Sequence, residues 1–208
     1  VPTGDAVGAV LAHSMQARRI AQGETSVYRI AKGTLLTAAH VADLAAHGHA
    51  QVSVARLEAG DLPENDAAEV LARALVPDPE RQNIRISAAG AGRVNLYAVG
   101  CGIVELDRRR LEAVNAVDPM ITIATVPNFH RVDAGGMIAT IKIISYAVPQ
   151  EAVLRAGADA GGALGVTAPV YASATLIETV TSSDIPSDKG RKAMTGRLHR
   201  MGMTLDDR

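Results

Sequence analysis

The strongest sequence signal for the fold of this chain is a series of short apolar segments between residues 84 and 148, separated by glycine-containing turns. Val94, Leu96 and Ala98 alternate with more polar residues, and a β-branched run follows at residues 121–126. Such alternation is typical of strands with one buried face, and glycine pairs favour tight turns between strands. The sequence therefore predicts a compact, antiparallel, β-rich region with one helix over residues 84–148.

A strand–helix–strand unit is predicted before this region. Thr37 is a good N-cap for a helix over residues 38–47, because its hydroxyl can accept a hydrogen bond from a free N–H group of the first turn. Gly48 suits the position that ends the helix. A short strand is expected near residues 52–57, and the polar residues 18–24 are predicted to form a loop.

A second helix is predicted over residues 64–75, with Asn65 or Asp66 as its cap. Proline cannot continue a helix, so Pro77 and Pro79 should end it. The apolar face of this helix is predicted to carry Val70, Leu71 and Leu75.

A linker is predicted near the C-terminal quarter of the chain. Residues 156–165 contain four glycines and several alanines, a composition typical of flexible connections. We therefore divide the chain into a mixed N-terminal region over residues 1–155, a linker over 156–168, and a C-terminal segment over 169–208.

The C-terminal segment follows the element order that opens a parallel α/β domain. A buried strand is predicted over residues 170–180, then a polar loop, then a basic helix over residues 189–201 that ends at Gly202. About 40 residues do not close such a domain, which takes on the order of 100. The expected fold class is α/β in its segments and α+β overall.

Composition narrows the possible partners. The formal net charge is −1, with 21 basic and 22 acidic residues, so no global basic field exists to hold nucleic acid or an anionic membrane. One phenylalanine, four tyrosines and no tryptophan argue against a base-stacking platform. Because we see no run of 18 apolar residues and only one cysteine, we expect a cytoplasmic location.

Histidines and the single cysteine are the first residues to test for chemistry. His40, His47 and His49 form the one histidine cluster, but metal sites usually add a carboxylate or cysteine. We interpret them as residues of a solvated helix end and predict no metal site. Cys101 lies between two glycines with no base beside it in the sequence, so we expect a buried, unreactive thiol.

The polar loop before the last helix is the best candidate binding site. It follows the predicted strand at the edge where open α/β sheets bind ligands, and the helix N-terminus offers free N–H groups to an anion. The alternative is an ordinary surface loop with Asp188 as the helix cap. The candidate residues are Ser182, Ser183, Asp184, Ser187, Asp188 and Lys189.

Parts of the sequence resemble proteins of molybdenum-cofactor biosynthesis. Residues 32–56 are similar to a segment of the molybdopterin molybdotransferase family, KG-x-x-L-T-x-x-D-I, with His40 in place of the family's acidic residue. Residues 92–144 resemble the N-terminal region of bacterial molybdopterin-binding proteins. Some relatives of these carry a nucleotidyltransferase domain of the molybdenum-cofactor cytidylyltransferase type.

Residues 171–208 resemble the start of the molybdopterin-binding domain of the same family. Asp188 stands where the family often has an aspartate before the helix. The family's Thr-Gly-Asp-Glu is replaced by Thr-Val-Thr-Ser at residues 179–182. The chain begins at Val1 and its last residues lie early in that domain, so we expect a fragment that is inactive alone.

The resemblance implies binding of molybdopterin, or of its nucleotide form, during biosynthesis or maturation of the molybdenum cofactor. In a longer protein, it implies a molybdotransferase or nucleotidyltransferase that uses Mg²⁺ and a nucleotide. The alternative from a different class is a non-catalytic accessory or assembly module. In that case, the β-rich region over residues 84–148 would bind a molybdoenzyme or a second copy of the chain.

Overall fold

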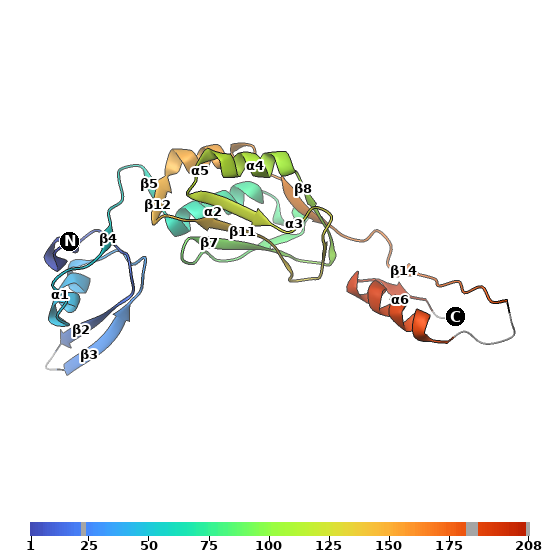
Figure 1. Cartoon of the computed structure of the whole chain (residues 1–208), viewed down its shortest axis with the longest axis horizontal. Helices are drawn as coiled ribbons and strands as arrows, with labels where there is room; N and C mark the ends of the chain where they lie inside the picture. The colour runs from blue at the N-terminus through green and yellow to red at the C-terminus, as the bar shows by residue number, and fades with distance from the viewer. Residues whose placement is uncertain (22–23, 182–186, 207–208) are drawn as a thin grey trace.

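The computed structural model describes residues 1–21, 24–181 and 187–206. Within this part of the chain, helices and mostly antiparallel strands are mixed, so the expected α+β class is confirmed. Figure 1 shows three successive bodies along the chain. We name them the N-terminal module (residues 1–56), the central unit (residues 61–167) and the C-terminal unit (residues 168–206).

The N-terminal module packs a β-hairpin and one helix around a small core. Its elements are η1 (Thr3–Ala6), β1 (Val10–Leu11), β2 (Met15–Ala21), β3 (Glu24–Ile30), α1 (Ala38–Ala46) and β4 (Val54–Ala55). The Thr37 hydroxyl accepts the His40 N–H, and Gly48 has a φ of 102°, so the predicted cap and end of this helix are confirmed. The core includes Leu11, Leu36 and Leu44.

Residues 18–24 were expected to form a loop, and this prediction is wrong. The described residues of that stretch belong to β2 and β3, which pair antiparallel from Met15 with Ile30 to Ala21 with Glu24. Most side chains of both strands are exposed. Because the hairpin buries so little, its sequence lacks the apolar alternation by which strands are recognised.

The central unit contains a four-stranded antiparallel sheet in the order β6-β7-β11-β9. These strands are β6 (Ile84–Ile86), β7 (Arg93–Ala98), β9 (Ile121–Thr125) and β11 (Met137–Ile143). A second sheet joins β10 (Arg131–Val132), β8 (Gly102–Leu106) and β13 (Leu164–Thr167). The short strands β5 (Asp61–Pro63) and β12 (Ala147–Pro149) pair beside them.

Helices pack on the four-stranded sheet and on one another (Figure 1). They are α2 (Glu64–Leu75), the short α3 (Pro79–Gln82), α4 (Arg108–Val117) and α5 (Gln150–Ala158). The bounds of α2 are those expected, but Pro63 is its N-cap and Val70 is exposed, unlike the buried Leu71 and Leu75. One continuous core runs from Ala67 to Val166.

The predicted linker over residues 156–168 is not a linker in the structure. Its first residues end α5, its last ones form β13 against β8, and Ala156, Ala160 and Ala163 are buried. The glycines allow close packing here: a Cβ on Gly157 would lie 2.8 Å from the Ala74 Cβ of α2. A glycine- and alanine-rich composition therefore suits close packing of two helices as well as a flexible linker, and composition alone does not distinguish them.

The C-terminal unit consists of β14 (Ser173–Ala174), α6 (Lys189–Arg200) and β15 (Thr204–Leu205). The two strands pair in parallel, and α6 lies between them in the sequence. The buried strand expected over residues 170–180 is wrong, because the pairing covers two residues and Val170, Tyr171 and Ile177 are exposed by 90%, 76% and 86%. The helix and its end at Gly202 are as expected.

No helix in the described part of the chain combines the length and apolar character that a membrane crossing requires.

Candidate functional site

The predicted ligand loop connects β14 to α6 in the C-terminal unit. Ser182, Ser183 and Asp184 lie outside the described residues. Ser187, Asp188 and Lys189 are described, and all three are exposed. Asp188 is the N-cap residue by position, but its side chain makes no capping hydrogen bond. The three described candidates are thus consecutive, exposed residues at the start of α6.

The helix after this loop is anchored through its polar side chains. Arg191 donates from Nη2 to the Asp206 carbonyl over 2.7 Å, and Thr175 donates from Oγ1 to the Asp206 carboxylate over 2.8 Å. Lys189 forms no ion pair with another described residue. Its ammonium, at the first position of α6, is available to an anion near the helix N-terminus.

Cys101 lies in the turn between β7 and β8, close to the end of α6. The expectation of full burial is wrong, since the residue is only partly buried. A Cβ on Gly202 would lie 2.7 Å from the Cys101 Sγ, so Gly202 approaches the thiol closely. Beside it, Arg131 donates to the Asp133 carboxylate. This hydrogen bond lowers the pKa of Asp133 and raises the pKa of Arg131.

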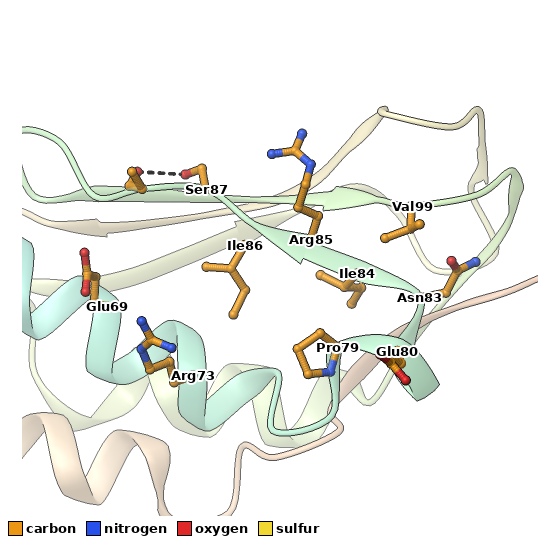
Figure 2. Close-up of a pocket in the computed structure, with 11 residues that line it drawn as sticks. Glu69, Arg73, Pro79, Glu80, Asn83, Ile84, Arg85, Ile86, Ser87 and Val99 are labelled. Carbon is orange, nitrogen blue, oxygen red and sulfur yellow. Dashed lines mark hydrogen bonds between the residues drawn. The ribbon is translucent and has the colours of Figure 1, made fainter.

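A crevice opens in the central unit between β6 and the helices α2 and α3, and it was not anticipated from the sequence. Its volume is about 720 Å³, within the range of small-ligand and peptide sites. Figure 2 shows Ile84 and Ile86 on the helix side of β6, facing Arg73 and Pro79, while Arg85 points to the opposite side. The remaining lining residues are Glu69, Glu80, Asn83, Ser87, Ala88 and Val99.

The sequence carried only a weak signal for this crevice. The alternation of Ile84, Arg85 and Ile86 indicates a strand with one apolar face. It does not indicate that the strand lies at the edge of a sheet, or that Arg73 faces it from a helix. Both facts depend on the strand order.

A buried carboxylate lies where the N-terminal module meets the central unit. The Glu64 side chain is 9% exposed, and its Oε2 lies 3.7 Å from the Lys142 ammonium. Lys142 also donates to the carbonyls of Ala91 and Ile143 over 2.7 and 2.6 Å. A Cβ on Gly92 would lie 2.8 Å from Glu64 Oε2. Only glycine fits there, and its φ of 70° favours the same residue.

Two further contacts join the N-terminal module to the same corner. The Tyr146 hydroxyl donates to the Ala12 carbonyl over 2.6 Å. The Lys32 ammonium lies 4.9 Å from the centroid of the Tyr146 ring, a distance at which cations are attracted to aromatic faces. These contacts join the N-terminal module to the central unit, and we assign them no catalytic role.

Two histidines of the N-terminal module, His40 and His49, have hydrogen-bond partners, whereas the buried His47 Nδ1 has none among the described residues. His40 Nδ1 accepts the Thr37 N–H over 3.3 Å and so completes a reciprocal cap of α1. His49 Nε2 lies 2.9 Å from the Gln16 carbonyl. Among the described residues, no group of three His, Cys, Asp or Glu side chains is placed to hold a metal ion.

One region of the chain is similar to a known family of domains. A family model described as "Domain of unknown function (DUF8806)" matches residues 1–56. This match has the same extent as the N-terminal module, which contains its own core. No curated protein and no solved structure matches the chain.

Proposed function

We propose that this protein binds molybdopterin in the biosynthesis or maturation of the molybdenum cofactor, through the connection between β14 and α6. The observation that carries the proposal is the parallel pairing of β14 with β15 around α6. In parallel α/β units, ligands bind beyond the carboxyl ends of the strands. The resemblance of residues 171–208 to the start of a molybdopterin-binding domain supports the same location.

The chemistry of the described residues suits an anionic ligand. The phosphate of molybdopterin would lie at the N-terminus of α6, where the helix presents N–H groups and a positive dipole end. Lys189 would add a charge-assisted hydrogen bond. Ser187 would add a neutral donor, and Asp188 would accept from N–H groups of the pterin ring.

In this proposal the chain contributes binding. Transfer of molybdenum or of a nucleotidyl group, with the Mg²⁺ and nucleotide that such chemistry uses, would belong to a longer protein that includes this chain. The proposed ligand is molybdopterin or its nucleotide form.

Calorimetric titration of molybdopterin tests the proposal with three variants. Lys189→Ala should weaken binding by about 1–2 kcal/mol, the scale of one charge-assisted contact, and Asp188→Asn should weaken it less. Arg197→Ala is the matched control, because Arg197 is an exposed basic residue in the last turn of the same helix. If Lys189→Ala and the parent protein bind molybdopterin with equal affinity, the N-terminus of α6 is not part of the binding site.

A second candidate function is an assembly module that binds a molybdoenzyme or a second copy of the chain. The exposure of three large apolar side chains within one short segment, Val170, Tyr171 and Ile177, favours it, since exposed apolar surface often marks interaction sites. Light scattering of the chain over a range of concentrations, with Ile177→Asp as the variant, separates self-association from a monomer.

A further inference from the structure

The strand β6 is an open edge of the four-stranded sheet. It pairs only with β7 among the described strands. Ser87 donates to the Asn95 carbonyl, and Val99 donates to the Asn83 carbonyl. Because hydrogen-bonded pairs alternate along an antiparallel ladder, Arg85 also faces β7 with its backbone. The N–H and C=O groups of Ile84 and Ile86 therefore point away from the sheet.

The crevice lies directly along this edge. Ile84 to Ala88 form one wall, and Arg73 of α2 and Pro79 of α3 stand on the other side (Figure 2). An extended segment added beside β6 would direct alternate side chains into the crevice. There they would meet the accessible apolar side chains of Ile86 and Val99, beside the buried Ile84.

The opposite face of the sheet is basic. The strands β6, β7, β9 and β11 carry Arg85, Arg93 and Lys142 and no acidic residue. Lys142 is paired with Glu64. Arg85 lies over the Tyr97 ring, 4.6 Å from its centroid, and neither Arg85 nor Arg93 forms an ion pair with a described residue. Side chains of an added strand on this face would therefore be favoured if acidic.

We propose that β6 binds an extended segment of a partner protein as an additional strand of the sheet. The segment has apolar residues at the positions that enter the crevice and acidic residues at the alternate positions beside Arg85. Backbone hydrogen bonds to Ile84 and Ile86 provide attachment, and the alternating side chains provide specificity, as in other cases of strand addition. A purely apolar small molecule would leave these backbone groups unpaired, so the edge favours a peptide.

Labelled synthetic peptides test this proposal on the whole chain by fluorescence anisotropy. A nine-residue peptide that alternates glutamate and valine should bind, and one that alternates lysine and valine should bind at least about tenfold more weakly. Tighter binding of the lysine peptide would contradict the proposal, as would equal binding of both peptides.

Two substitutions of Ile86 distinguish backbone pairing at the edge of β6 from side-chain contacts in the crevice. Ile86→Pro removes an N–H that points outward and leaves the pairing with β7 intact, as proline does on edge strands. Ile86→Ala shortens the same side chain but keeps the N–H. We expect Ile86→Pro to bind the acidic peptide about tenfold more weakly than Ile86→Ala does, by loss of one backbone contact and by steric exclusion. Equal affinities would contradict strand addition.

A charge exchange covers the case in which Ile86→Pro does not fold. Arg85→Glu changes an exposed side chain and should reverse the preference, so that the lysine peptide binds more tightly than the glutamate peptide. An unchanged preference overturns the proposal. So does a dimer of the parent chain that Arg85→Glu or Ile86→Pro dissociates, because the edge would then pair with a second copy. Lys189→Ala should leave peptide binding unchanged, which keeps this test independent of molybdopterin binding.

Discussion

The central unit and the C-terminal unit contain similar elements but differ in what covers them. In the central unit, one buried cluster joins α2, α5 and the strands from Ala67 to Val166. In the C-terminal unit, no described residue between 168 and 206 is buried. The first unit is stabilised by its own apolar contacts. The second has a helix and a two-stranded sheet whose apolar side chains remain largely in water.

The largest expected difference between the units is in the cost of removing a leucine side chain. Leu71 is fully buried in α2, so Leu71→Ala should lower the free energy of unfolding by about 2–5 kcal/mol. Leu198 is only half-buried in α6, so Leu198→Ala should cost less than about 1 kcal/mol. Urea unfolding followed by circular dichroism measures both. Similar costs would show that the C-terminal unit is covered in solution.

Glycine substitutions sharpen the same comparison. A Cβ on Gly102 would overlap the Thr167 carbonyl where β8 meets β13, so Gly102→Ala should destabilise the protein by about 1–3 kcal/mol. A Cβ on Gly190 of α6 meets nothing within 4 Å, so Gly190→Ala should stabilise that helix by up to about 1 kcal/mol. Thermal unfolding and helix content by circular dichroism report the two signs. A destabilising Gly190→Ala would reveal a contact on α6.

Limited proteolysis locates the boundary between the two units. Chymotrypsin should cut first after Tyr171, which is exposed in a segment with little backbone pairing. Residues 156–167 should resist cleavage because they are packed against α2 and β8. Mass spectrometry of the early fragments identifies the sites. Early cleavage between residues 156 and 167 would instead support the flexible linker that the sequence predicted.

The smallest expected effect is a pH dependence within the N-terminal module. The Tyr28 hydroxyl donates to Asp43 over 2.6 Å, and Arg19 lies 3.1 Å from the same carboxylate. The hydrogen bond from Tyr28 is the main cause of a pKa of Asp43 below its ordinary value of 3.8. Its stabilising contribution is therefore complete above about pH 4 and is lost as the pH falls through the lowered pKa.

The variant Asp43→Asn tests this pH dependence. As the pH falls from neutral, the parent chain should lose more of its free energy of unfolding than Asp43→Asn loses, because the variant has no carboxylate to protonate. Tyr28→Phe should reduce the difference by removing the main donor. Identical acid titrations of all three proteins would show that the cluster adds nothing to stability.

Local signals in the sequence were sufficient for α1, α2 and α6, whereas α3 and α5 were not predicted. The Thr37 cap, the end of α6 at Gly202 and the bounds of α2 each depend on residues within a few positions of one another. Asn65 shows the limit of such signals: it was expected to cap α2, but its side chain accepts the Gly92 N–H from another part of the chain.

Local patterns in the sequence were enough to place α1, α2 and α6 and to predict that strands follow one another closely between residues 84 and 148. Only the tertiary structure decided which segments are covered. The alanine- and glycine-rich residues 156–167 are buried because α2 and β8 lie against them, whereas the more apolar residues 170–180 are exposed because no described element covers them. The open edge of β6 likewise follows from strand order. Burial and pairing are relations between distant segments, so composition within one segment does not specify them.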